Sequence, residues 1–492
     1  MAESDLEPHF LRQLISVFGM VLCRYALFDR LSAVIDKSSV FPVRRKAICC
    51  QVRPSISPLN LSPVNTLSSK RHVLVRSLTA ILRWINIWLK FSPCIIFYPL
   101  ALISDYGNQL WWRYTIYALN SSGPTVIKFA QWAATRRDIF NADVISRLSQ
   151  LHTRVTPLPF SKIEPAVARS LGENWSETIT IDGLIGSGSI AQVYRGTLVG
   201  SGQDVAIKVC RDGVHDSIET DIDILRCLAW VSDKLPVLHA LKSSAAVEAF
   251  SEFLVAQTDL RTEARNLEKF QENFTNSKSV RFPRVHFASE EVLIESFEDG
   301  ILLTDLLADP ELSKYHKLAC EKGTSAFLKM LFDDNFVHGD LHPGNILFNS
   351  TNETLTFLDC GLVSTLEPRD YRNFADLFSA IATGRASDVG RLMIERSRGS
   401  ITDVKDPDGF CLGVEELVVA TSKQREGFSL KGLQLGNLFR SLLGLACTHG
   451  VELESNFVAT CCSLIVLDGV GKALDPDRDI LAAATPYLLR VR

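Results

Sequence analysis

The chain has 492 residues, of which 46% are hydrophobic, and this is enough for two or three domains with sizeable buried cores. Its formal net charge of −4 gives no electrostatic basis for binding nucleic acid. The 12 cysteines form no C-x-x-C pair, which favours free thiols in a reducing compartment over zinc ligands or disulfides.

The N-terminal part of the chain is poor in acidic residues. Between Lys37 and Ser104 there is no Asp or Glu, whereas Arg, Lys and Ser are frequent. This composition is typical of a mitochondrial transit segment, so we predict a mitochondrial protein with a leader and linker over residues 1–75. The extreme N-terminus is acidic instead, and translation from Met20 would give a more basic leader. Sequencing the N-terminus of the mature protein would decide between these starts.

Residues 76–175 are expected to form an N-terminal helical extension. Its segment Phe91–Ser104 is apolar, but two prolines interrupt it and it is shorter than the roughly 20 residues of a membrane-spanning helix. Trp residues flank the segment, as at membrane interfaces. We expect a membrane-associated helical region, with a true span as the alternative.

Within the extension, GPTVIKFAQWAATRRDIF begins with Gly123 and Pro124, and proline suits the first turn of a helix. Lys128 and Gln131 are three residues apart and therefore lie on one face of that helix. By spacing alone, a solvated helix face is the simpler interpretation of this pair.

From Glu177 onward the pattern changes to strands. ITIDGLIGSGSIAQVYRGTLV predicts a strand, a glycine-rich turn and a second strand, and such turns let backbone N–H groups approach phosphate oxygens. DVAIKVC follows as an alternating strand, which is where kinases carry the lysine that holds nucleotide phosphates. We therefore predict a nucleotide site that includes Gly186, Ser187, Gly188, Ser189, Ala191 and Lys208.

Two helices are predicted next, over residues 216–235 and 244–274. Along the second, polar residues recur at Gln257, Asp259 and Glu263. Asp259 and Glu263 are four residues apart and are expected to share a helix face. A kinase-like site needs a carboxylate that pairs with Lys208, and we assign this role to Glu263.

The strands that follow end in EVLIESFEDG. Residues 295–299 are predicted to form the hinge that meets the adenine of ATP, with Glu295 and Phe297 among the nucleotide-binding residues.

The segments FVHGDLHPGNILF, at 336–348, and FLDCGL, at 357–362, carry the chemistry. Phosphoryl transfer needs one carboxylate that orients the attacking oxygen, plus an amide and a second carboxylate that hold Mg²⁺. The kinase signatures place these groups at the spacing of Asp340, Asn345 and Asp359. We predict Asp340 as the catalytic base and the other two as Mg²⁺ ligands; two solvated turns are the simpler alternative. No A-P-E follows, which argues against an ordinary protein kinase.

Together these motifs resemble the UbiB or aarF-domain-containing atypical kinases over about residues 75–492. The shared features are KFAQ, GSGSIAQV, VAIK, QTD, HGDLHPGN and DCG in the same order, and VELESNFVATCCSLIVLDGVG is similar to the family's closing helices. The GSGSIAQV and QTD variants are most like the mitochondrial subgroup of aarF-domain-containing kinase two.

The resemblance implies that the KFAQ helix packs over the active site and that its lysine contacts an acidic E-x-D motif. The gate residues would be Lys128, Gln131, Gln257 and Asp259. Ala130 and Gln257 depart from the family pattern, which leaves Asp259 as the anion for Lys128. Most family members have alanines where this chain has Gly186 and Gly188, so nucleotide preference is expected to differ.

The resemblance further implies an α+β, protein-kinase-like fold with two lobes, over residues 176–300 and 301–492, and the second lobe ends in a helical C-terminal tail. It implies ATP and Mg²⁺ as cofactors, atypical kinase or ATPase activity, and a role in coenzyme Q biosynthesis or mitochondrial lipid metabolism at the inner membrane. Expected partners are a membrane lipid or quinone-like molecule and a coenzyme Q biosynthetic complex, with no nucleic acid. The alternatives are a nucleotide-gated lipid-binding scaffold and a small-molecule phosphotransferase similar to choline kinases.

Overall fold

The structure is a computed structural model that describes residues 70–135, 142–148, 156–234, 243–395, 397, 404, 406–423, 435–451 and 453–491. The predicted leader therefore lies almost wholly outside the described residues. The chain divides into two compact units: unit 1 is Met1–Thr115 with Thr220–Val247, and unit 2 is Ile116–Glu219 with Glu248–Arg492.

The described part of unit 1 is helical. Its elements are α3 (Lys70–Ile96), α4 (Tyr98–Ile103), the part of α5 (Asp105–Ser121) up to Thr115, and the part of α9 (Val214–Asp233) from Thr220 onward. Arg83 of α3 donates two hydrogen bonds, at 2.9 and 3.0 Å, to the buried carboxylate of Asp221 on α9. This bidentate pair neutralises the arginine that interrupts the apolar sequence and fixes α3 against α9.

Large apolar side chains remain exposed on α3, α4 and α5. Those of unit 1 are Ile81, Leu82, Ile85, Leu89, Ile96, Phe97, Leu100, Leu102, Ile103, Tyr106 and Leu110. By length and composition the stretch Ile81–Ile103 could cross a membrane, and only 28% of its most apolar window is buried. An exposed apolar patch of this kind marks a protein or membrane contact. We call these residues the apolar surface of unit 1.

Unit 2 begins with helices on the N-terminal side of its first sheet. They are α6 (Pro124–Thr135), α7 (Ala142–Leu148) and α8 (Glu164–Leu171). Gly123 has a φ of 95°, which a glycine adopts without strain, and α6 starts at Pro124 as predicted. Phe129 of α6 packs edge-to-face on Phe250 of α10 (Ser243–Thr258), with ring centroids 5.2 Å apart.

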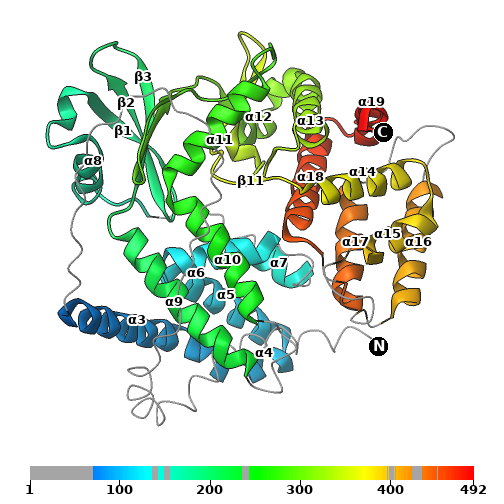
Figure 1. Cartoon of the computed structure of the whole chain (residues 1–492), viewed down its shortest axis with the longest axis horizontal. Coiled ribbons are helices and arrows are strands. Elements are labelled where there is room, and N and C mark those ends of the chain that lie inside the picture. Colours follow the sequence, from blue (N-terminus) through cyan, green and yellow to red (C-terminus); the bar gives the residue numbers. More distant parts are fainter. Residues whose placement is uncertain are drawn as a thin grey trace. The chain divides into compact units, whose positions relative to one another are not determined.

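The first sheet of unit 2 has five antiparallel strands. Their order is β1 (Ile179–Ser187), β2 (Ala191–Leu198), β3 (Asp204–Cys210), β6 (Val292–Ser296) and β5 (Val285–Ala288). One face is apolar because alternate residues of β3 and β6 point to it, and it packs against α8 beside the sheet in Figure 1. The buried members of this face are Val205, Ile207, Val209, Val292 and Ile294. The helix α11 (Leu260–Asn273) carries Glu263.

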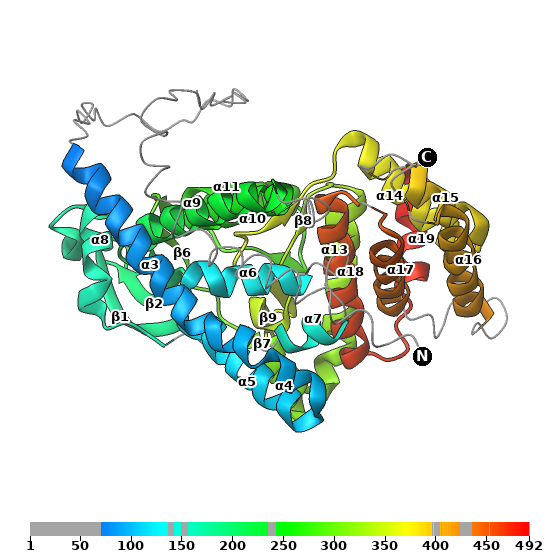
Figure 2. The same cartoon turned by 90° about the horizontal axis from the view of Figure 1, so that it is seen from below.

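The rest of unit 2 contains two small sheets and a helical region. A four-stranded sheet has the order β4 (Val280–Arg281), β10 (Thr354–Phe357), β9 (Ile346–Asn349), β7 (Ile301–Leu302), and β8 (Val337–His338) pairs with β11 (Val363–Ser364). The helices are α12 (Leu303–Ala308), α13 (His316–Phe332), α14 (Pro368–Ala382), α15 (Ala386–Glu395), α16 (Pro407–Lys423), α17 (Leu435–His449), α18 (Ser455–Leu474) and α19 (Ile480–Val491). Helices α15, α16 and α17 stand side by side in Figure 1, and α14 runs across them and contacts α15. Figure 2 shows the same helices after a 90° turn.

The predicted helix over residues 244–274 is two helices in the structure. The stretch 244–274 is broken at Asp259, whose backbone is extended and whose side chain accepts a hydrogen bond from Arg261 N at 3.0 Å. Asp259 is therefore the N-cap of α11, and it does not share a continuous helix face with Glu263. An Asp side chain can hydrogen-bond to nearby backbone N–H groups outside a helix, and at Asp259 this capping interaction is formed in place of a continuous helix.

Candidate functional site

Lys208 lies at the centre of a charged cluster on the second face of the first sheet. Its ammonium donates to both oxygens of Glu263, at 2.9 and 2.7 Å, and to Asp359 Oδ1 at 2.9 Å. Burial alone would lower the pKa of Lys208, but the carboxylates of Asp359 and Glu263 raise it above its ordinary value. The lysine therefore stays a cation, held by the carboxylate that the sequence predicted for it.

Asp359 follows β10 and occupies an unusual backbone conformation. Its φ is 51°, in the left-handed region that Asp tolerates better than most residues. Burial would raise the pKa of Asp359, but the charge and hydrogen bond of Lys208 hold it below its ordinary value, so the carboxylate is ionised. A Cβ atom at Gly361 would lie only 3.3 Å from Asp359 Oδ1, so a larger residue there would have to displace this carboxylate slightly.

The catalytic-loop segment is positioned by His338. This ring is fully buried, donates from Nε2 to Leu358 O at 2.9 Å, and accepts from Asp340 N at Nδ1 at 3.1 Å. Burial lowers the pKa of His338, so the neutral ring keeps one donor and one acceptor. Asp340 is thereby fixed by its backbone, while its carboxylate is half-exposed.

Asn345 joins the two predicted loops. Its side-chain Nδ2 donates to the backbone carbonyl of Asp340 at 3.1 Å. The backbone carbonyl of Asn345 accepts from the backbone N–H of Leu358, the residue before Asp359, at 2.8 Å. In the part of the chain that the structure describes, no three His, Cys, Asp or Glu side chains gather to hold a metal alone. An amide oxygen and a carboxylate fit Mg²⁺, which takes few protein ligands and completes its shell with phosphate and water oxygens.

The glycine-rich turn between β1 and β2 is closed by a hydrogen bond from Gly188 N to Ala191 O at 2.9 Å. Arg211, the residue after β3, donates to Ser187 Oγ and to Gly188 O, each at 2.9 Å. Ser189 is buried within the turn. The sequence reasoning missed Arg211, although its place directly after the lysine strand was a usable signal.

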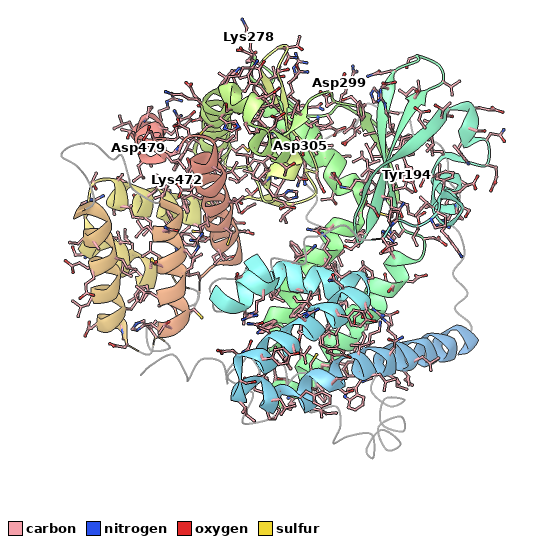
Figure 3. All side chains as sticks on the ribbon, turned by 180° about the vertical axis from the view of Figure 1, so that it is seen from behind. Tyr194, Lys278, Asp299, Asp305, Lys472 and Asp479 are labelled. Carbon is pink, nitrogen blue, oxygen red and sulfur yellow. The ribbon has the colours of Figure 1, made fainter. Side chains whose placement is uncertain are left out.

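Gln192, in the AQV part of the glycine-loop motif, is also structural. It is fully buried, accepts from Leu158 N at 2.8 Å, and donates to Leu158 O at 3.2 Å and to Tyr194 Oη at 2.8 Å. The side-chain amide therefore binds the incoming segment as a neighbouring strand would. Tyr194 is labelled on this sheet in Figure 3.

The KFAQ helix α6 brings Lys128 toward the charged cluster. Burial lowers the pKa of Lys128, although the nearby carboxylates of Asp359 and Asp340 act in the opposite direction. Gln131 lies on the same helix, three residues further on. The lysine that spacing alone would leave in solvent is thus near the carboxylates of Asp359 and Asp340.

The expected pairing of Lys128 with Asp259 is wrong among the described residues. Asp259 instead pairs with Arg261, at 2.8 Å from Nε, because it caps the helix on which that arginine lies. At Gln257, which ends α10 with Thr258, the side-chain oxygen Oε1 is buried without a hydrogen-bond partner. The anions that act on Lys128 are therefore Asp359, Asp340 and Glu263, and not the QTD aspartate.

The predicted hinge leaves β6 at Ser296. Glu295 is buried on the face of the sheet that carries Lys208, whereas Phe297 is half-buried with the Arg195 guanidinium 4.5 Å from its ring centroid. Phe297 N donates to Asp204 O at 3.2 Å. Of the two predicted side chains, only Glu295 therefore lies on the side of the sheet where Lys208 contacts Glu263 and Asp359.

The chain is similar to known proteins along most of its length. Residues 150–393 match the family described as the ABC1 atypical kinase-like domain. A mitochondrial ABC1 family protein of Schizosaccharomyces pombe is 32% identical, over 83% of this chain and 70% of that protein. The chain belongs to the ABC1 family.

Other ABC1 relatives extend into bacteria. A Vibrio cholerae protein named "Probable protein kinase UbiB" is 31% identical over 75% of this chain and 69% of its own. A Mycobacterium tuberculosis protein solved with erythromycin aligns with a TM-score of 0.45 at 19% identity, over 65% of this chain and 84% of that chain. The resemblance to UbiB and the kinase-like fold predicted from the motifs are confirmed by the family match and by the S. pombe and V. cholerae relatives.

Proposed function

We propose that this ABC1 protein binds Mg-ATP at the Lys208 cluster and transfers or hydrolyses the terminal phosphate. The observation that carries the proposal is the position of Lys208 between Glu263 and Asp359, at 2.7 to 2.9 Å. A permanent cation that is fixed from two sides is suited to binding phosphate oxygens, because its position does not have to be organised when the nucleotide arrives.

The side chains then take distinct roles. Lys208 holds the phosphates and Glu263 orients Lys208. Asp340, fixed through its backbone N–H to His338, accepts a hydrogen bond from the attacking hydroxyl or water and orients it. Asn345 and Asp359 would hold Mg²⁺, which when bound neutralises charge on the phosphate oxygens.

The acceptor is constrained by α6. Lys128 lies near Asp340, the residue that would orient the acceptor, and the chain has no A-P-E segment to seat a peptide. Both observations favour water, a lipid or another small molecule over a protein substrate. They also support a second candidate, a scaffold in which ATP binding and slow hydrolysis change the position of α6.

We further propose that the protein acts at the mitochondrial inner membrane and supports coenzyme Q biosynthesis or lipid metabolism. Two fungal relatives are named mitochondrial, and a bacterial relative is named UbiB. The apolar surface of unit 1, with Ile81–Ile103 at a mean hydropathy of 1.4, supports a membrane contact.

The test is Mg²⁺-dependent ATP binding and hydrolysis by the full chain, with and without cardiolipin-containing vesicles, beside Asp359→Asn. We expect turnover that the variant lowers by about 100-fold or more, the scale for losing a group that stabilises developing charge. Asp376→Asn, which changes a carboxylate on α14 outside the cluster, is the matched control. Nucleotide binding without turnover in the parent chain would favour the scaffold, and no binding at all would refute the nucleotide site.

A further inference from the structure

Glu295 shares a face of the first sheet with Lys208. In the antiparallel register Lys208 is opposite Leu293 and Ala206 is opposite Glu295. Alternate residues of a strand point to the same side, so Leu293 and Glu295 project with Lys208 and away from the apolar face that packs on α8. Glu295 is the last buried residue of β6 before the segment predicted to meet the base.

The side chain of Glu295 has no hydrogen-bond or ion-pair partner within the described residues. Only 8% of the residue is exposed, and Oε2 is buried without a partner. Buried polar groups in folded proteins are nearly always hydrogen-bonded, because an orphaned one costs free energy. Several other buried side-chain atoms of the described residues also lack a partner, but Glu295 lies on the face of the sheet that carries Lys208, where a nucleotide at the proposed site is in position to supply one.

The charge state of Glu295 determines which partner fits. Burial raises its pKa to about 8, with Glu263 acting in the same direction and Lys208 against it. Near neutral pH the side chain is therefore mostly a carboxylic acid, which offers one O–H donor and one acceptor oxygen. Adenine presents an amino donor next to a ring-nitrogen acceptor, and a neutral donor–acceptor pair such as a glutamine amide binds that edge with two hydrogen bonds.

We propose that the Glu295 side chain binds the amino edge of adenine and so determines the base specificity of the site. This inference rests on the proposed nucleotide site. It extends that proposal, because the predicted hinge at residues 295–299 says only where the base lies and not which side chain recognises it. The Glu295 side chain would recognise the base, and its buried carboxyl lowers the stability of the protein when no nucleotide is bound.

The experiment compares affinities of the full chain for Mg-ATP and for Mg-purine riboside triphosphate, which lacks the amino group. We expect the parent chain to prefer ATP by about 10-fold, the factor that corresponds to one hydrogen bond. Glu295→Met should abolish this preference. Glu295→Gln should keep it, because the amide reproduces the donor and the acceptor of the neutral acid.

A second readout separates this role from a structural one. Removing an unpartnered buried carboxyl should leave the melting temperature of unliganded Glu295→Met equal to that of the parent or higher. Asp468→Asn, at a buried carboxylate that accepts from Gly436 N at 2.9 Å, is the control and should keep the ATP preference. An unchanged ATP preference in Glu295→Met, or a lowered melting temperature, would overturn the inference while leaving the nucleotide site intact. Failure of the parent chain to bind either nucleotide would refute both.

Discussion

The two faces of the first sheet differ in what their buried residues contribute. On the face toward α8, every buried residue of β3 and β6 is aliphatic and is packed in one cluster. On the other face, Lys208 and Glu295 lie among the buried apolar residues Ala206, Leu293 and Cys210, and Glu263 of α11 joins them. The same two strands thus supply a purely aliphatic surface on one side and ionisable groups on the other. Stability resides in the first face and ligand chemistry in the second, because burying charge is unfavourable unless it is paired.

The largest expected effect on stability lies on the apolar face. Ile207→Ala should lower the free energy of unfolding by about 2–5 kcal/mol, the range for truncating a fully buried aliphatic side chain. Its effect on ATP affinity should be small, because the side chain points away from Lys208. Urea unfolding and nucleotide titration of the same preparation would check both. Val255→Ala, at an exposed position on α10, is the control.

On the charged face, Glu263→Gln should lower ATP turnover by about 100-fold, the factor for losing a charge-assisted hydrogen bond of roughly 2–3 kcal/mol. Stability should change less than in Ile207→Ala, because Lys208 keeps Asp359 at 2.9 Å and the amide oxygen can still accept. Steady-state kinetics beside thermal melts would test this. Equal losses of stability in the two variants would contradict the division of roles between the faces.

The orphaned carboxyl on the charged face should make stability depend on pH. Between its ordinary pKa of 4.5 and its folded pKa of about 8, Glu295 holds a proton in the folded state that the unfolded state has released. Stability therefore falls as pH rises through this range. Glu295→Met removes the fall, so the variant should gain about 1–3 kcal/mol on the parent between pH 5 and pH 8.

Melting curves at several pH values would measure that gain. The pKa of Glu295 also depends on the charged groups around it, which are Glu263 of α11, Lys208 of β3, Asp359 after β10 and Glu298. A constant difference between variant and parent across the pH range would mean that Glu295 is ionised throughout.

The smallest effect is expected in the glycine-rich turn. A side-chain carbon at Gly186 would meet only Val193, at 3.7 Å, an ordinary contact. Gly186→Ala should therefore leave stability unchanged or raise it by up to about 1 kcal/mol, through a more restricted unfolded chain. The same change at Gly196 would collide with the carbonyl of Thr180 and should destabilise the sheet strongly. Chemical denaturation of both variants would show whether glycine at position 186 is kept for folding or for the ligand.

Much of the fold was predictable because it follows local signals. Pro124 starts α6, the strand–turn–strand pattern gives β1 and β2, and alternation gives β3. The break at Asp259 was missed because an Asp within a helical pattern can either continue a helix or cap the next one, and periodicity does not distinguish them. The short strand Val280–Arg281 pairs in parallel with β10, and not with the strands of the first sheet that follow it in the sequence. Register between distant segments is set by packing and is not written in either segment alone.

The site was predictable where residue spacing encodes it. The pairing of Lys208 with Glu263 followed from the order of a strand lysine and a helix carboxylate. The partners of Lys128 did not, since Asp359 and Asp340 come to α6 through tertiary packing. Arg211 and Gln192 were missed because each acts on backbone carbonyl or amide groups, which leave no pattern in the sequence. The catalytic and metal-binding roles themselves stay predictions.

The left-handed backbone conformation of Asp359 determines which substitutions can test the role of its carboxylate. Asp and Asn tolerate a φ near 51°, whereas alanine is strained there by roughly 1–2 kcal/mol. An alanine substitution would therefore combine a lost carboxylate with a displaced loop, and inactivity in that variant would not identify its cause. Asparagine removes the charge and keeps the backbone, whereas glycine removes the side chain and frees the backbone. Comparing these two replacements separates the electrostatic contribution of this residue from its conformational one.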